Sequence, residues 1–187
     1  MKTVGVLGIQ GAIEEHEKSI RNLGLNTVRV LAPEDLKKID GIILPGGEST
    51  AMGKQLEWFG LMEPLRKAIA AGLPAFGTCA GMILLAKEIE GSNQTRIGLM
   101  DITVKRNAYG SQLDSFVTDL KVAGFKQALP AVFIRAPRIE KCAKNVDILA
   151  SYKNHPVLVR QKHLLAASFH PELTDNTELH RYFTQMM

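Results

Sequence analysis

Residues 74–86, PAFGTCAGMILLA, decide the fold of this chain. A short apolar run ends at Cys79, and a second apolar run with helical spacing follows immediately. Gly77 and Gly81 flank the cysteine, and glycine permits the sharp turn that a strand needs to lead directly into a helix. A cysteine buried only for packing does not need two glycines beside it. We therefore predict a strand–turn–helix unit that presents the Cys79 side chain.

The segments around this unit alternate between strand-like and helix-like patterns in the first half of the chain. Strand patterns occur at residues 3–9, 26–31 and 41–47, and helical patterns at about 13–23, 49–71 and 80–89. Such alternation predicts βαβ units and a mainly parallel sheet with helices on both faces. The second half has six shorter strand-like runs and a final amphipathic helix at about 175–187, which indicates antiparallel additions to the sheet.

The whole pattern predicts one three-layer α/β/α domain over residues 1–187, with a flavodoxin-like central sheet. This length is sufficient for a sizeable core. No apolar run approaches the ~20 residues that cross a bilayer, and the first residues lack the pattern of a secretory signal, so we expect the cytoplasm. Two cysteines make no disulfide framework, and no metal-binding motif is present, so we expect neither metal nor cofactor.

The charge of the chain does not indicate nucleic-acid binding. The net charge is +4, but the lysines and arginines are spread along the chain and no recognition motif accompanies them. We expect a solvated surface or a face for an acidic partner, and no interaction with nucleic acid or membrane.

Cys79 lies in the pattern G-x-C-x-G, the thiol equivalent of the nucleophile elbow G-x-S-x-G. Open α/β sheets bind ligands at the carboxyl ends of their strands, which is where this cysteine is expected. The elbow would turn the N–H of Ala80 toward the position of an oxyanion. The start of a helix also favours the thiolate. The alternative explanation is a small buried side chain at a tight turn.

A thiol nucleophile needs a base, and the segment SFHPEL at residues 168–173 supplies one. His170 is expected at a strand end, with Glu172 two residues later on the same side of an extended chain. Pro171 between them disfavours helix at His170. Glu172 can then hold one ring nitrogen while the other faces the thiol. His16 is expected to pack on a helix face or contact the surface, and the remaining histidines are expected to be solvated: His155, His163 and His180.

A second oxyanion donor is expected in LPGGEST, residues 44–50, which leaves another strand end. Gly46 and Gly47 let backbone amides approach a substrate closely. Glycine pairs are common in loops, so a plain turn before a helix is the alternative explanation.

The three motifs together resemble the class I, or triad, glutamine amidotransferases. Longer segments, which extend from residue 4 to about 174, are similar to the PdxT-type glutaminase subunits of pyridoxal 5′-phosphate synthases. These segments are GVLGIQGAIEEH, ILPGGESTAM, FGTCAGMILLAKEI, VFIRAP and AASFHPELT. QGAIEEH and GGEST distinguish this subgroup from the glutaminases of histidine or purine synthesis.

The resemblance implies that the chain hydrolyses L-glutamine to L-glutamate and ammonia through a thioester. Cys79 would be the nucleophile, His170 the general base and then the general acid, and Glu172 the group that orients the imidazole. The backbone N–H groups of Gly47 and Ala80 would bind the oxyanion. Glutamine would be held by six residues: Gly47, Glu48, Ser49, Arg106, Ile134 and Arg135.

The resemblance also implies a partner, because the chain has no motif for an acceptor of ammonia. A PdxS-type synthase subunit would receive the ammonia within a hetero-oligomeric complex. We expect docking at the helix that contains GAIEEHEK, residues 11–18, and at the loop before it. The family tends to have arginine where this chain has Ser111 and glutamate where it has Val117, so local contacts are expected to differ there.

Three other functions use the same residues. A γ-glutamyl hydrolase would act alone on a larger substrate, and a glutaminase could serve a different synthase. A regulatory module would use Cys79 as a redox sensor. A sensor needs only an activated thiol, whereas this sequence has a complete Cys, His and Glu set.

Overall fold

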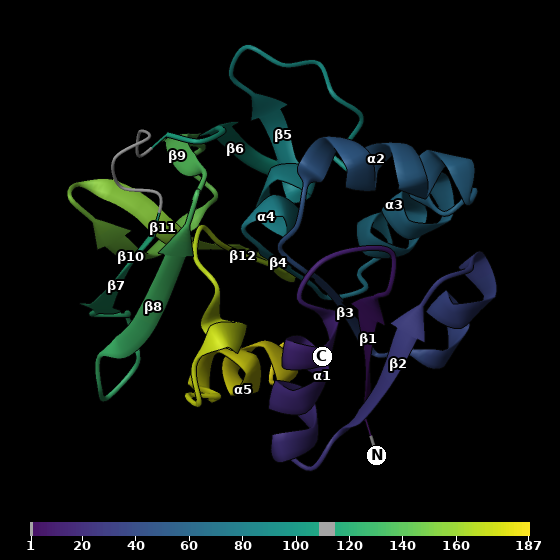
Figure 1. The fold of residues 1–187 in the computed structure, drawn as a ribbon, viewed down its shortest axis with the longest axis horizontal. Helices are drawn as coiled ribbons and strands as arrows, with labels where there is room; N and C mark the ends of the chain where they lie inside the picture. The colour runs from purple at the N-terminus through teal and green to yellow at the C-terminus, as the bar shows by residue number, and fades with distance from the viewer. Residues whose placement is uncertain (1, 109–114) are drawn as a thin grey trace.

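The centre of the computed structural model, which describes residues 2–108 and 115–187, is a seven-stranded sheet (Figure 1). Its strand order is β10-β11-β12-β4-β3-β1-β2. The five strands from β12 to β2 run parallel, and β11 and β10 are antiparallel additions at one edge. The bounds are β1 Thr3–Leu7, β2 Asn26–Val30, β3 Gly41–Leu44, β4 Ala75–Thr78, β10 Asp147–Tyr152, β11 His155–Gln161 and β12 Leu164–Ala167. This sheet confirms the predicted fold class.

Helices form a layer on each face of the sheet. α1 (Ile13–Asn22) and α5 (Glu178–Thr184) lie together on one face, and α2 (Ser49–Trp58), α3 (Met62–Ala70) and α4 (Ala80–Leu85) cover the other (Figure 1). Successive side chains of a strand point to opposite faces. Ile42 and Leu44 of β3 therefore pack with α2, α3 and α4, whereas Ile43 between them packs with α1 and α5. No helix in the described part of the chain combines the length and apolar character needed to cross a bilayer.

The parallel strands bring their carboxyl ends to one edge of the sheet. Their order, with β1 between β2 and β3 and with β4 and β12 following, is the flavodoxin-like order, in which ligands bind beyond the strand ends. The loops that follow β3, β4 and β12 contain Gly46, Cys79 and His170 respectively. The sheet topology therefore brings together three motifs that are far apart in the sequence.

Two smaller sheets lie beside this edge. One contains β5 (Ala86–Ile89), β6 (Met100–Lys105) and β9 (Arg138–Cys142), and the other pairs β7 (Ser115–Leu120) with β8 (Leu129–Ile134). An isolated bridge joins Val132 of β8 to His170. The β7–β8 hairpin is therefore attached to the chain that follows β12.

The predicted helix at 80–89 is wrong in its second half, because residues 86–89 form strand β5. The carbonyl oxygen of Leu84 accepts hydrogen bonds from the N–H groups of Ile97 and Gly98 instead of continuing the helix. β5 then pairs in parallel with β6, an interaction with a distant segment that no local pattern predicts.

Two other helix predictions differ from the structure, one in the number of helices and one in length. The predicted helix at 49–71 is divided into α2 and α3 at Gly60, which has φ 64°. The N–H of Leu61 bonds back to the carbonyl of Leu56 at this break. The final helix covers only Glu178–Thr184, and the short 3₁₀ helices η1 (Pro33–Lys38) and η2 (Pro171–Leu173) were not predicted.

The predicted turn around Cys79 is present, and its glycines are sterically required. A Cβ atom added to Gly77 would lie 2.5 Å from the backbone of Gly81. A Cβ atom on Gly81 would lie 1.9 Å from the carbonyl oxygen of Leu44 in β3. Because no real Cβ contact is this short, the first turn of α4 can pack on β3 only if residue 81 is glycine.

Replacement of Gly81 by alanine should therefore destabilise the protein strongly. We expect Gly81→Ala to lower the free energy of unfolding by about 3 kcal/mol or more, because a backbone atom has to move. Gly124→Ala is the matched control, since Gly124 has φ 83° but open space around it. It should cost about 1 kcal/mol. Urea unfolding of both variants measures the difference, and equal losses would contradict the steric explanation.

Candidate active site

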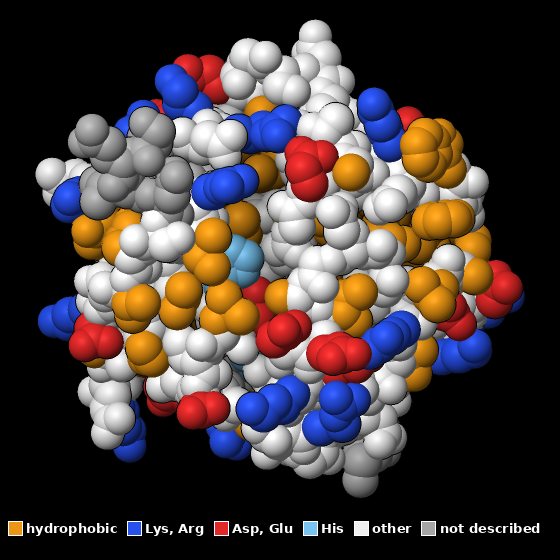
Figure 2. All heavy atoms as spheres, viewed as in Figure 1, with side chains coloured by type: hydrophobic (Ala, Val, Ile, Leu, Met, Phe, Trp, Pro, Cys, Tyr) orange, Lys and Arg blue, Asp and Glu red, His pale blue; other side chains and the backbone are white. Residues whose placement is uncertain are grey.

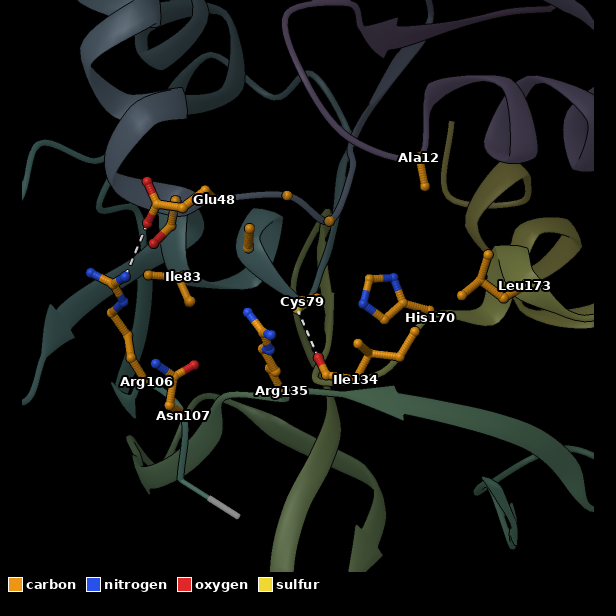
Figure 3. A pocket seen from close by; sticks show the side chains of 14 residues that line it. Ala12, Glu48, Cys79, Ile83, Arg106, Asn107, Ile134, Arg135, His170 and Leu173 are labelled. Atoms are coloured by element: carbon orange, nitrogen blue, oxygen red, sulfur yellow. Dashed lines mark hydrogen bonds and ion pairs between the residues drawn. The ribbon is translucent and has the colours of Figure 1, made fainter. Parts of the chain in front are cut away.

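A cavity of about 460 Å³ opens at the carboxyl ends of β3, β4 and β12 (Figure 3). All the predicted site residues line it except Glu172, which is buried behind His170. The lining consists of Ala12, Gly46, Gly47, Glu48, Ser49, Cys79, Ala80, Ile83, Arg106, Asn107, Ile134, Arg135, His170 and Leu173. Figure 2 looks onto this side of the molecule, where a histidine side chain is visible between apolar and basic side chains.

Cys79 occupies a strained turn between β4 and α4. Its backbone has φ 48°, a value that is uncommon for residues other than glycine. The N–H of Cys79 donates to the carbonyl of Ala167 in β12, at 2.9 Å, and its Sγ lies 4.0 Å from the carbonyl oxygen of Ile134. Strained backbone of this kind persists where the surrounding structure enforces it, often at functional sites. Cys79 is 8% exposed and borders the cavity.

His170 and Glu172 form the expected pair, but not in the expected backbone geometry. Strand β12 ends at Ala167, and His170 immediately precedes the 3₁₀ turn Pro171–Leu173. The turn, rather than an extended chain, brings Glu172 Oε1 to 2.7 Å from His170 Nδ1. The N–H of His170 donates to the carbonyl of Val132, at 2.8 Å. The ring is therefore fixed by its backbone on β8 and by its carboxylate partner.

The surroundings of His170 favour the imidazolium. Burial lowers the pKa of His170, but hydrogen bonds with Cys79 and Glu172 and the charges of both groups raise it more strongly, to about 10. In Figure 3 the ring lies beside Cys79 and away from Arg106. A protonated imidazole next to a thiol stabilises the thiolate, which is the nucleophilic form of cysteine.

Two histidines outside this pair are completely buried. His16 on α1 and His180 on α5 are both 0% exposed, and their rings contact each other between the two helices and the sheet. The prediction that His180 is solvated was wrong, because α5 packs its His180 side against α1 and Phe76. Neither histidine lines the cavity, and the polar contacts of His16 lead to Glu172 from behind.

The backbone N–H groups of Gly47 and Ala80, which border the cavity, have no acceptor among residues 2–108 and 115–187. The carbonyl of Gly46 faces Gly11, because a Cβ atom on Gly11 would lie 1.7 Å from that oxygen. The C=O and N–H of a trans peptide point in opposite directions, so the N–H of Gly47 points away from Gly11. Gly46 itself has no room for a side chain, since a Cβ atom would lie 2.3 Å from His170 Cε1.

The two arginines that were predicted to bind glutamine differ in their polar contacts within the described residues. Arg106 is ion-paired with Glu48, at 3.0 Å (Figure 3). It also donates to Thr50 and Gln94. Glu48 in turn accepts hydrogen bonds from the N–H groups of Thr50 and Ala51 at the start of α2. Burial raises the pKa of Glu48, but these amide bonds and Arg106 outweigh it and hold the pKa below its usual value. Arg135 has φ 44° and no ion-pair partner in the described part of the chain.

Five lining residues were not among the predicted site residues: Ala12, Gly46, Ile83, Asn107 and Leu173. Ala12 and Gly46 lie within motifs that the sequence analysis had singled out. Leu173, 42% exposed, directly follows Glu172 and was identifiable as an apolar residue in a surface turn. Ile83 lies within the motif FGTCAGMILLAKEI, whereas Asn107 had no sequence signal. Of the two departures from the family pattern, Val117 is exposed on β7 outside the cavity, and Ser111 lies outside the described residues.

Comparison with known proteins gives a consistent result. The model of the SNO glutamine amidotransferase family matches residues 6–187. A protein of Carboxydothermus hydrogenoformans named pyridoxal 5′-phosphate synthase subunit PdxT is 56% identical over 97% of this chain and 96% of its own length. A protein with the same name from Fervidobacterium nodosum is 50% identical over 98% of this chain and 96% of its own length.

The solved structures agree with these sequence relationships. A crystal structure described as glutamine amidotransferase superposes with a TM-score of 0.94 at 45% identity, over 98% of this chain and 97% of that one. A putative GMP synthase component of Thermoplasma acidophilum has a TM-score of 0.74 at 18% identity, over 100% and 94%, and shows likeness of fold alone.

Replacement of Glu172 by glutamine should lower the pKa of His170 from about 10 toward its ordinary 6.5, since an amide keeps the shape but loses the charge. Because the pKa of His170 is raised in the folded protein, protonation of this residue stabilises the fold. The contribution is complete below pH 6.5 and is lost as the pH rises toward 10. In Glu172→Gln the stability of the protein should therefore depend less on pH in this range. NMR titration of the His170 Cε1 proton measures the pKa, and thermal unfolding across this pH range measures the stability.

Glu178→Gln is the matched control for this experiment. It removes a carboxylate from the first turn of α5, whereas the groups that raise the pKa of His170 are Cys79 and Glu172. It should leave the His170 titration unchanged. An unaltered His170 pKa in Glu172→Gln would show that the carboxylate does not support the imidazolium.

Proposed function

Since this chain belongs to the SNO glutamine amidotransferase family, we propose that it is the glutaminase subunit of a pyridoxal 5′-phosphate synthase. It hydrolyses L-glutamine to L-glutamate and ammonia and delivers the ammonia to the synthase subunit. The whole chain, residues 1–187, acts as one glutaminase domain. The cytoplasm is the proposed location, since a catalytic thiol is maintained in a reducing compartment.

One observation carries this proposal: a cysteine at a strained elbow faces a buried histidine that is itself held by a carboxylate. In the proposed reaction the Cys79 thiolate attacks the carboxamide carbon of glutamine. His170 then gives its proton to the leaving nitrogen, so that ammonia departs and a thioester remains. His170 next takes a proton from water, which attacks the thioester and releases glutamate. Glu172 orients the ring and stabilises the imidazolium in both steps.

Each attack places negative charge on the carbonyl oxygen, and this charge needs hydrogen-bond donors. The N–H groups of Gly47 and Ala80 are the proposed donors, because both border the cavity and neither has an acceptor in the described segments. Preorganised donors at such a position typically contribute about 3–4 kcal/mol of transition-state stabilisation. The absence of side chains at residues 46 and 47 lets the backbone approach both His170 and the substrate.

The remainder of glutamine is proposed to lie between the loop after β3 and the end of β8. Arg135 is the best-placed partner for the substrate carboxylate, because its guanidinium borders the cavity beside Cys79 and forms no ion pair with any residue that the structure describes (Figure 3). Arg106 has three acceptors already and is proposed to act together with Glu48 as one edge of the pocket. Ser49 and Ile134 complete the proposed binding surface.

Docking of the synthase subunit is proposed at α1 and the loop before it. Ala12 of this loop borders the cavity, and Glu14 and Glu15 at the first turn of α1 are exposed. A partner on this surface would lie next to the site where ammonia is released. Proximity matters because ammonia that escapes into water at neutral pH is mostly protonated and no longer nucleophilic.

Glutamate release from glutamine tests the proposed function directly. We expect slow release by the chain alone, faster release with added synthase subunit, and loss to background in Cys79→Ala, since the thioester cannot form. Release that persists in Cys79→Ala would remove the proposed nucleophile. Release without any response to the synthase subunit would instead favour a stand-alone γ-glutamyl hydrolase or a different synthase. The double variant Glu14→Lys/Glu15→Lys should lose the response to the partner if docking uses α1.

The two arginines should differ in their effect on glutamine binding. Arg135→Gln should raise KM for glutamine about 10- to 100-fold, the usual effect of losing a charge-assisted hydrogen bond worth about 1.5–3 kcal/mol. Arg106→Gln is the matched control and should raise KM less, because its present partners are protein groups. Steady-state kinetics with saturating synthase subunit measures both. An unchanged KM in Arg135→Gln would contradict the assignment of the carboxylate partner.

A further inference from the structure

A buried polar cluster lies behind the His170–Glu172 pair, and the proposed reaction does not use it. It consists of His16 on α1, His180 on α5 and Thr78 at the end of β4, all 0% exposed. His16 Nδ1 is 2.9 Å from His180 Nε2, and His16 Nε2 is 3.1 Å from Thr78 Oγ1. The same Nε2 lies 3.4 Å from Oε2 of Glu172. His16 therefore contacts the carboxylate oxygen that faces away from His170.

The hydrogen-bond directions in this cluster depend on the tautomer of His16. Burial lowers the pKa of His16 and, to about 4, that of His180, and a positive charge on His180 or on His170 lowers the pKa of His16 further. Both rings are therefore neutral near pH 7. A carboxylate can only accept, so the tautomer of His16 that can serve Glu172 is the one with its proton on Nε2. Its Nδ1 must then accept from the Nε2–H of His180. His180 Nδ1 is then the last atom in this series of hydrogen bonds, and it has no hydrogen-bond partner within the described segments.

Glu172 needs a donor at its second oxygen. Oε1 is occupied by His170, whereas Oε2 has no well-directed hydrogen bond in the described part of the chain, and His16 Nε2 lies 3.4 Å from it. A buried carboxylate oxygen without a donor is costly. The terminal torsion of glutamate is also broad. A contact at Oε2 therefore determines whether the carboxylate plane stays directed toward His170 Nδ1.

Packing alone does not explain why histidine occupies this place. The ring centroids of His16 and His180 lie 6.4 and 6.0 Å from that of Phe76, and Phe183 lies 5.7 Å beyond on the same core. An apolar side chain would fit among these rings without the desolvation cost that a buried imidazole carries.

We propose that His16 is a positioning residue for the glutaminase reaction: its Nε2–H, shared between Thr78 and Glu172, holds the carboxylate toward His170, and His180 fixes the required tautomer of His16. This inference rests on the proposed function and adds two helices to its site. Because α1 begins beside the cavity at Ala12, the position of the proposed docking helix is linked to the orientation of the catalytic carboxylate.

Paired substitutions of His16 separate positioning from packing. His16→Leu removes the donor at similar volume, and His16→Gln keeps an N–H donor. With saturating synthase subunit, His16→Leu should lower kcat about 10- to 100-fold, as is typical for loss of a group that orients a reacting residue. KM for glutamine should change less than about threefold, since His16 does not border the cavity. His16→Gln should recover a substantial part of kcat.

The rate of Cys79 alkylation by iodoacetamide gives a second readout that does not depend on the substrate. It is measured in a Cys142→Ser background, so that Cys79 is the only thiol. His16→Leu should slow alkylation and His16→Gln should restore it, because the His170 imidazolium that activates the thiol depends on Glu172. His163→Leu is the control for the loss of a histidine hydrogen bond elsewhere, since His163 bonds the carbonyl of Ile69. It should lower the melting temperature without changing kcat or alkylation.

The outcomes are distinct. Lower kcat and slower alkylation in His16→Leu, both restored in His16→Gln, support the positioning role. Unchanged kcat and alkylation in a folded His16→Leu overturn it while leaving the glutaminase intact. If His16→Leu does not fold, His180→Phe decides: it removes the tautomer-fixing donor and should lower kcat and alkylation, and wild-type values would overturn the proposal. If the wild type lacks glutaminase activity, the proposed function fails, and alkylation alone decides the role of His16.

Discussion

The close approach of the first turn of α4 to β3 is the constraint on which the rest of the site depends. Gly81 lies so near the carbonyl of Leu44 that no side chain fits there, and Gly77 lies similarly close to Gly81. This contact forces the chain to reverse within two residues and holds Cys79 at φ 48°. Because Cys79 also donates its N–H to β12, the same turn sets the distance between the thiol and the histidine that follows β12.

The charges of the site are arranged to offset the cost of burial. His170 loses hydration, yet a carboxylate on one side and a thiol on the other keep its pKa well above the usual value. Glu172 is buried as well, so its own second oxygen must be satisfied by the protein. In the proposed arrangement each buried group has the next as its hydrogen-bond partner, in the order His170, Glu172, His16 and His180. This series ends at a neutral imidazole nitrogen of His180, whose desolvation costs less than that of a charge.

Loops and the ends of neighbouring elements form much of the cavity surface, whereas Cys79 and His170 lie just beyond the ends of strands β4 and β12. The loop after β3, the end of β8 and the segment before α1 supply the groups that are proposed to bind glutamine or the partner. Such segments can adjust to a ligand without moving the strands that carry Cys79 and His170. α1 contributes both to the proposed docking surface and to the buried support of the site. Its exposed face carries Glu14 and Glu15, and its buried face carries His16.

Local sequence determined the order of strands and helices, the elbow at Cys79, and the pairing of His170 with Glu172, because these depend on neighbours within a few residues. Even there, the backbone route to the pair was a 3₁₀ turn and not an extended strand. Only the tertiary structure decided that residues 86–89 are a strand and that Arg106 is ion-paired with Glu48. It also decided that His16 is hydrogen-bonded to His180, which lies 164 residues away in the sequence. The reason is physical. Hydrophobic spacing specifies which face of an element is buried, but which partner it meets depends on how distant elements pack on the sheet, and this is not encoded in any single segment.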